Sequence, residues 1–116
     1  MIRIVSLAAA LALLAAPLAA QPAAPLSLEH RMLLRCSAAF ALVAARQDAG
    51  DAEALAWPPL KERGREFFVR ASAKVMDEAK LDRAALAEAM RREAEAVVGE
   101  DALERIMPPC LDALAA

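Results

Sequence analysis

From residue 28 onward, apolar residues recur with the roughly 3.6-residue period of an α-helix. In the stretch 28–46 they are spaced four, four and three residues apart, which places them on one helical face. These residues are Met32, Cys36, Phe40 and Val43. Ser27 precedes the stretch, and its hydroxyl can accept hydrogen bonds from the free N–H groups of a first helical turn. We therefore predict a long amphipathic helix with a cysteine in its apolar face.

The second predicted helix spans residues 59–80. It begins at Pro59, where the N–H group that proline lacks is not needed. Its apolar face consists of Leu60, Gly64, Phe67, Phe68, Ala71, Val75 and Met76. Gly64 lies inside this helix, where a glycine costs roughly 1 kcal/mol relative to alanine. We expect another helix to approach closely at Gly64 and so to offset this cost.

A third helix is predicted over residues 82–99. Asp82 is its expected N-cap, and Gly99 marks its expected end. Its charged residues, Glu93 among them, are expected to face water, as in any helix that packs on one side only. Its inner side is expected to carry Leu86, Met90, Ala94, Val97 and Val98.

The fourth predicted helix begins at Asp101, which together with Glu104 fits a capping box. Pro108 and Pro109 are expected to kink or break this helix, because proline removes a backbone hydrogen bond and collides with the preceding turn. A short helical turn, capped by its first residue, is expected over residues 51–57. No segment alternates between apolar and polar residues with period two. The chain is therefore predicted to be all-α, a small bundle of about four helices.

Residues 1–20 have the layout of a secretory signal peptide: a short start with Arg3, an apolar run, and small residues before a cleavage site after Ala20. The apolar run of roughly 13 residues is shorter than the ~20 that a membrane-spanning helix needs. An uncleaved anchor is the alternative. Residues 21–27 contain two prolines and are predicted to form a flexible leader, followed by a helical domain over 28–116. We expect a periplasmic or secreted protein that keeps no stable membrane anchor after cleavage.

The chain has two cysteines, Cys36 and Cys110. An exported protein with an even number of cysteines is expected to pair them. The loop that they close spans 74 residues. By the chain-entropy estimate such a disulfide contributes about 4 kcal/mol, a large share of the ~5–15 kcal/mol that a domain has in total. A redox-active pair would need a Cys-x-x-Cys motif, which is absent, and a buried free Cys36 is the other alternative.

Aromatic residues are few, with three Phe, one Trp and no Tyr in 116 residues. The core must therefore be built mainly from Leu, Val, Met and Ala. The formal net charge is -2 at pH 7, whereas proteins that bind nucleic acids in general carry a basic excess. We expect no nucleic-acid partner.

The residue types that usually carry catalysis are sparse. His30 is the single histidine, so no histidine pair is available for a metal ion. Ser27, Ser37 and Ser72 belong to no G-x-S-x-G motif. The three glycines lie far apart, which excludes a Gly-rich phosphate loop. We predict that the protein is not an enzyme and that it holds no cofactor and no metal ion.

Large apolar side chains are the remaining candidates for binding. Methionine and aromatic side chains adapt to varied apolar partners, although packing in the core is an alternative role for each of them. The candidate apolar binding surface consists of Trp57, Phe67, Phe68, Met76 and Met90.

The plan of Cys36 and Cys110 at the two ends of a run of amphipathic helices resembles that of small exported bacterial all-helical proteins with two cysteines. Among these, the chain resembles the acid-activated periplasmic chaperones in size, helical content and a disulfide that joins distant helices. The resemblance implies a non-catalytic binding or chaperone-like module whose partner is a protein client. The second hypothesis is a carrier of a small apolar molecule, held in a pocket between the second and third predicted helices.

Overall fold

The computed structural model describes residues 25–99 and 101–116, and within these ranges every regular element is a helix. The elements are α1 (Leu28–Asp48), α2 (Ala52–Leu55), α3 (Lys61–Ala79), α4 (Arg83–Glu95) and α5 (Ala102–Ala115). The predicted all-α class is confirmed, and α2 is the short helical turn expected before the second long helix. The predicted signal peptide and residues 21–24 of the predicted leader lie outside the described residues.

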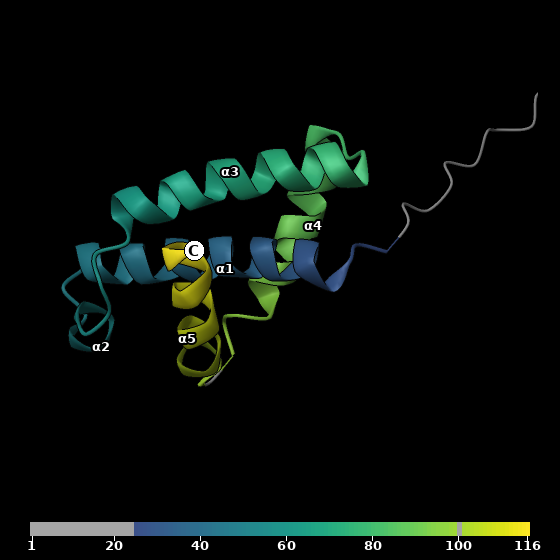
Figure 1. Cartoon of the computed structure of the whole chain (residues 1–116). Helices are drawn as coiled ribbons and strands as arrows, with labels where there is room; N and C mark the ends of the chain where they lie inside the picture. Colours follow the sequence, from purple (N-terminus) through teal and green to yellow (C-terminus); the bar gives the residue numbers. More distant parts are fainter. Residues whose placement is uncertain (1–24, 100) are drawn as a thin grey trace, which may run out of the picture.

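Helix α1 is the centre of the fold, because each of the other four helices packs against it. Figure 1 shows α3 lying along the length of α1, α4 and α5 crossing α1 steeply, and α2 near its C-terminal end. Helix α5 packs chiefly on α1, and α4 contacts both α1 and α3. The first long helix therefore organises the chain, as we expect for a long amphipathic helix that the others can pack against.

The core consists of two clusters of buried side chains, and α1 contributes residues to both. The larger cluster includes Phe40, which is fully buried and packs edge-to-face on Phe67 with ring centroids 5.1 Å apart. The smaller cluster joins Leu34 of α1, Val75 of α3 and Ala89 of α4. Because removal of apolar surface from water is the main driving force of folding, α1 holds the other helices together through both clusters.

Gly64 of α3 lies where α3 and α1 come closest. A Cβ atom on Gly64 would lie 3.0 Å from the Cβ atom of Phe40. The optimal separation of two non-bonded carbon atoms is about 3.5–4.0 Å, so a side chain at this position would require Phe40 or one of the two helices to shift. The close approach predicted at Gly64 is confirmed, and Phe40 is the residue that requires the space.

Three of the predicted N-caps are confirmed, because their side-chain oxygens accept backbone N–H groups of the first helical turn. They are Ser27, Asp51 and Asp82. The capping box expected at Asp101 is wrong, since its side chain makes no capping hydrogen bond. Asp101 has a φ of 59° in the left-handed region, whereas the side chain of an N-cap reaches the first turn from an extended backbone.

Of the kink or break expected at Pro108 and Pro109, a break does not occur, because α5 continues as one helix across both prolines. The two prolines leave the carbonyl groups of Glu104 and Arg105 without their usual N–H partners four residues on. Both of those residues are exposed, so water can satisfy their carbonyl oxygens. The opposite face of α5 is buried and carries Cys110, and this packing keeps the helix in place.

Two positions in the third predicted helix differ from the expectation. Helix α4 ends at Glu95 rather than at Gly99, so Val98 lies in the connection to α5 and is 69% exposed. Glu93, which was expected to face water, is buried between α4 and α1. Two guanidinium groups of α1 pair with its carboxylate, and this pairing offsets the desolvation of the charge.

A side-chain hydrogen bond joins the start of α1 to the end of α3. His30 Nε2 lies 3.0 Å from Glu78 Oε2, and this hydrogen bond, assisted by the Lys74 ammonium group, holds the pKa of the Glu78 carboxyl below its ordinary value of 4.5. Because the folded-state pKa is lowered, the contribution of Glu78 to stability is present above the unfolded-state pKa. It is lost as the pH falls through the folded-state pKa.

We expect the substitution His30→Ala to raise the pKa of Glu78 toward 4.5, because it removes the largest cause of the lowered value. The measurement is an NMR titration of the carboxyl carbons. Lys61→Gln is the control, since Lys61 pairs with Asp48 at the far end of α1 and its loss should leave Glu78 unchanged. A Glu78 pKa that stays the same in His30→Ala would show that the hydrogen bond does not form in solution.

Candidate functional site

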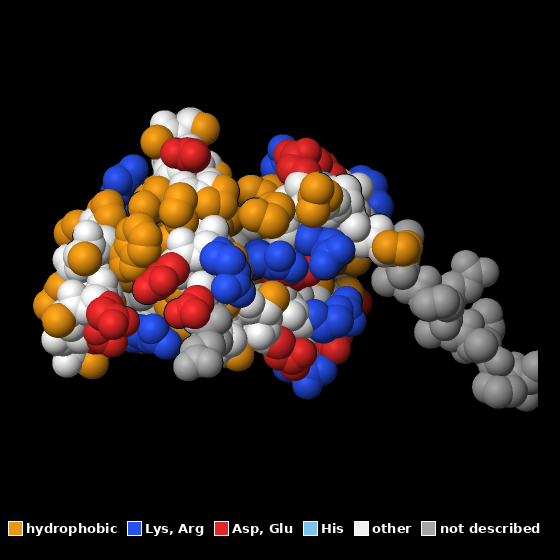
Figure 2. All heavy atoms as spheres, turned by 90° about the horizontal axis from the view of Figure 1, so that it is seen from below, with side chains coloured by type: hydrophobic (Ala, Val, Ile, Leu, Met, Phe, Trp, Pro, Cys, Tyr) orange, Lys and Arg blue, Asp and Glu red, His pale blue; other side chains and the backbone are white. Residues whose placement is uncertain are grey.

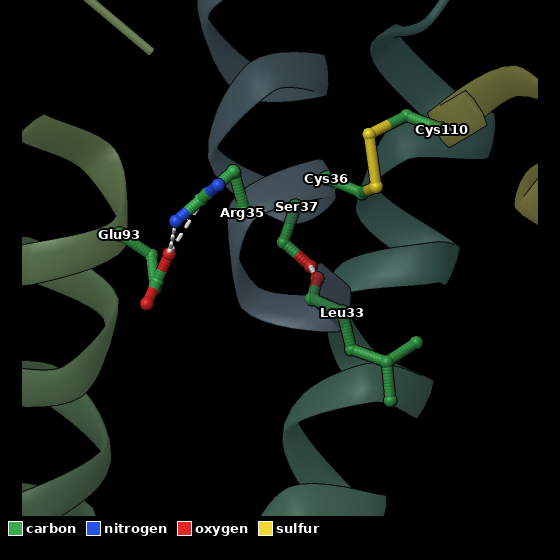
Figure 3. Close-up of a disulfide and its surroundings, with 6 residues drawn as sticks. All are labelled: Leu33, Arg35, Cys36, Ser37, Glu93 and Cys110. Atoms are coloured by element: carbon green, nitrogen blue, oxygen red, sulfur yellow. Dashed lines mark hydrogen bonds and ion pairs between the residues drawn. A yellow bond between two sulfur atoms is a disulfide. The ribbon is translucent and has the colours of Figure 1, made fainter. Parts of the chain in front are cut away.

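Cys36 and Cys110 join the middle of α1 to α5 through the predicted disulfide. Their Cα atoms are 5.2 Å apart, and both residues are buried. Figure 3 shows the disulfide on one side of α1, away from the side on which Arg35 reaches toward α4. Because α5 packs chiefly on α1, this bond adds a covalent link to the one helix that α5 contacts most.

An open groove lies between the C-terminal part of α1, the α2 segment and the connection from α4 to α5. Its volume is about 690 Å³, within the range of roughly 300–1,000 Å³ that is usual for ligand sites. Seven apolar residues line what we call the Trp57 groove: Val43, Ala54, Ala56, Trp57, Val97, Val98 and Leu103. Trp57 is half-buried and Val98 is exposed, so apolar surface is accessible from the groove.

Gln47 of α1 holds the backbone around Trp57 in place. Its side-chain Nε2 donates to the carbonyl oxygens of Ala54, Trp57 and Pro58 at 3.0, 3.2 and 2.9 Å. Its Oε1 accepts the N–H group of Leu60 at 3.2 Å. One side chain thus contacts four backbone polar groups in and beside the turn between α2 and α3, with its two N–H groups shared among three carbonyl oxygens. The indole of Trp57 is therefore presented at the groove by a fixed backbone, and such preorganisation reduces the entropy lost on binding.

The charged side chains at the Trp57 groove are mainly acidic. They are Arg46, Glu53, Asp101 and Glu104. Figure 2, which looks at the molecule from below, shows acidic side chains next to apolar surface in the left half of this face. Three carboxylates against one guanidinium give the groove a net negative charge, which favours a ligand with basic groups.

The structure places the five residues of the candidate apolar surface in different surroundings. Trp57 lines the groove, whereas Phe67 is buried in the larger core cluster. Met90 packs against the smaller core cluster. Phe68 is 43% exposed on α3, and Met76 is half-buried on the same helix. Of the five, only Trp57 belongs to the Trp57 groove, and core packing accounts for Phe67 and Met90.

Sequence reasoning missed the role of Gln47, which holds the turn beside the groove, and the exposure of Val98, which lines it. Gln47 borders the apolar face of α1, and its position shortly before a Trp-Pro-Pro turn is the one signal that it could serve a bent backbone. Val98 has no such signal, because its exposure depends on where α4 ends.

Neither similarity to known proteins nor a cluster of metal-ligating side chains in the described residues indicates the function. No group of three or more His, Cys, Asp and Glu side chains that could hold a metal ion occurs in the described part of the chain. Within residues 25–99 and 101–116, no helix has both the length and the apolar character that a bilayer crossing requires. No family model, curated protein or solved structure matches this chain. The groove itself is therefore the basis for a functional proposal.

Proposed function

We propose that this protein is a non-catalytic binding module that takes an apolar segment of a protein client into the Trp57 groove. The observation that carries the proposal is the accessible apolar surface of Trp57 and Val98 in the groove, where Gln47 holds the backbone of Trp57 in place. Tryptophan is enriched among the residues that dominate binding energy, because its large ring buries much area and keeps one polar atom. An open groove also admits a segment of a longer chain.

The charges at the groove narrow the kind of client. Glu53, Asp101 and Glu104 outnumber Arg46 among the lining residues. A segment with apolar side chains next to Lys or Arg would match both the apolar floor and the acidic rim, and charge complementarity of this kind favours the correct partner and speeds encounter. We propose such a basic, apolar segment as the preferred ligand.

The proposal includes export to a periplasmic or extracellular location. Disulfides persist in oxidising compartments and are rare in the cytosol, and the Cys36–Cys110 disulfide joins two elements of the core. The signal-peptide layout of residues 1–20 supports the same compartment. The client hypothesis is preferred to the small-molecule carrier, because Phe67 and Met90 pack into two separate core clusters rather than into one cavity.

Val98→Asp is expected to weaken the binding of a short Leu-, Phe- and Lys-rich peptide by at least about tenfold. The substitution removes apolar contact area and places a charge that binding must desolvate. Val98 is 69% exposed, so the fold should be unaffected. Trp57 is the single tryptophan, and its fluorescence emission should move to shorter wavelength when the wild-type protein binds the peptide. The titration of this emission gives the affinity.

Val69→Asp is the matched control, because Val69 is 58% exposed on α3 and lies outside the residues that line the groove. It should bind the peptide as the wild type does. Equal affinity of wild type and Val98→Asp would overturn the groove as the site. The proposed function itself would be overturned by two results together: no change in the Trp57 emission of the wild type when the peptide is added, and no slowing of the aggregation of an unfolded client.

A further inference from the structure

A second groove lies between the N-terminal half of α1 and the C-terminal half of α4. Its volume is about 460 Å³, and none of its lining residues belongs to the Trp57 groove. We call it the basic groove, because three arginines line it. The residues at its wall include Leu26, Arg31, Arg35, Ala89, Arg92 and Glu93. Figure 2 shows basic side chains in a row across the middle of the face that is seen from below.

Glu93 sets the position of two of the three arginines. Its Oε1 accepts from Arg31 Nε at 3.0 Å, and its Oε2 accepts from Arg35 Nε and Nη2 at 2.9 and 2.8 Å. The Glu93 side chain is only 9% exposed, so it is a buried anchor, and Figure 3 shows Arg35 reaching across to it from α1. The guanidinium groups of Arg31 and Arg35 are therefore held in a fixed arrangement at the mouth of the groove.

The positive charge of this groove is not balanced by the carboxylates around it. Its wall carries three guanidinium groups and one carboxylate. Glu88 lies near Arg92, with 3.6 Å between Arg92 Nη1 and Glu88 Oε1, but both oxygens of Glu88 are engaged by Arg91 at 2.7 and 2.6 Å. Arg92 is 63% exposed and its contact with Glu88 is long, so its guanidinium group at the groove wall remains accessible to a ligand.

We infer that the basic groove binds a small organic anion, with a carboxylate or phosphate group held by Arg31, Arg35 and Arg92. The planar fork of N–H donors on a guanidinium group matches the oxygens of both anions. Leu26 and Ala89 provide apolar surface beside the charges, which suits a short hydrocarbon body on the ligand. This site is independent of the Trp57 groove, so either proposal can fail without the other.

The test is a heteronuclear NMR titration of the full exported chain with hexanoate, hexyl phosphate and hexanol. The two anions should shift the backbone amide signals of α1 near Arg31 and Arg35 and of α4 near Arg92, and the anion that binds more tightly identifies the preferred head group. Hexanol, which has the same hydrocarbon body and no charge, should leave these signals in place. Hexanol binding as strongly as hexanoate would overturn the inference, as would the absence of any shift with both anions.

Arg92→Gln should weaken anion binding by about tenfold, the factor expected when one charge-assisted hydrogen bond is lost. Because Arg92 is exposed, the variant should fold as the wild type does. The amide spectrum of the ligand-free variant checks its fold directly. Arg83→Gln is the matched control, because it removes the same charge from an exposed position on α4 outside the groove lining. Equal weakening by the two substitutions would show general attraction of anions to the surface and would overturn the site.

Discussion

Replacing Cys36 and Cys110 together with alanine is expected to lower the free energy of unfolding by about 4 kcal/mol. The disulfide closes a loop of 74 residues, so its removal restores much conformational freedom to the unfolded chain. Alanine is chosen because serine would add an unpaired hydroxyl to positions that are buried. Urea unfolding followed by far-UV circular dichroism gives the change. In a small domain with few aromatic residues, a loss of this size removes much of the total stability.

Two comparisons make this prediction specific. Wild-type protein unfolded in the presence of a reductant should show a similar loss, whereas the double alanine variant should not respond to the reductant. Ser37→Ala is a control on α1, since the Ser37 hydroxyl donates only to the Leu33 carbonyl oxygen within the same helix. A double variant that keeps its stability within about 1 kcal/mol would contradict the loop-entropy account, and would mean that packing of α5 on α1 suffices.

Phe40→Ala is expected to lower the free energy of unfolding by about 4 kcal/mol, within the ~3–5 kcal/mol usual for truncation of a buried phenylalanine. Phe40 is fully buried, and its ring packs edge-to-face on Phe67. The substitution removes apolar contacts from the interface between α1 and α3 and leaves a cavity. The measurement is again urea unfolding, with the slope of the transition compared between variants to check that the denatured state is unchanged.

Phe68→Ala is the matched control, because Phe68 is the next residue to Phe67 and is 43% exposed. Its truncation should lower the free energy of unfolding much less than that of Phe40.

Gly64→Leu tests the geometry of the same site from the other helix. In the wild type it should be destabilising, since even a Cβ atom there would lie 3.0 Å from Phe40. In the Phe40→Ala background the same substitution should be tolerated better, and strict additivity of the two would contradict their contact.

Several features of the fold follow from short stretches of the chain. The period of apolar residues predicts the four longer helices, because an amphipathic pattern has one periodicity in a helix and another in a strand. Ser27, Asp51 and Asp82 cap their helices because a cap needs only the first turn of its own helix. Gly64 predicts a close neighbour for an equally local reason, since a glycine within a helix is unfavourable unless space demands it.

Other features depend on neighbours that are distant in the chain. Glu93 is buried because α4 crosses α1 where Arg31 and Arg35 point, and no pattern within residues 82–99 contains that information. The helix across Pro108 and Pro109 persists because its prolines face water while the opposite face is buried. A rule about one residue type, such as helix breaking by proline, gives way when tertiary packing supplies more free energy than the lost hydrogen bonds remove.

The amino-acid sequence by itself determined the all-α class, the positions of the long helices and the two cysteines that pair, since these depend on local periodicity and on residue type. Only the tertiary structure decided which surfaces face one another. The Trp57 groove requires Val43, Trp57 and Val98 to come together, and the basic groove requires α1 to lie across α4. Both sites are made from segments that are separated along the chain, and the crossing of helices on α1 brings them together.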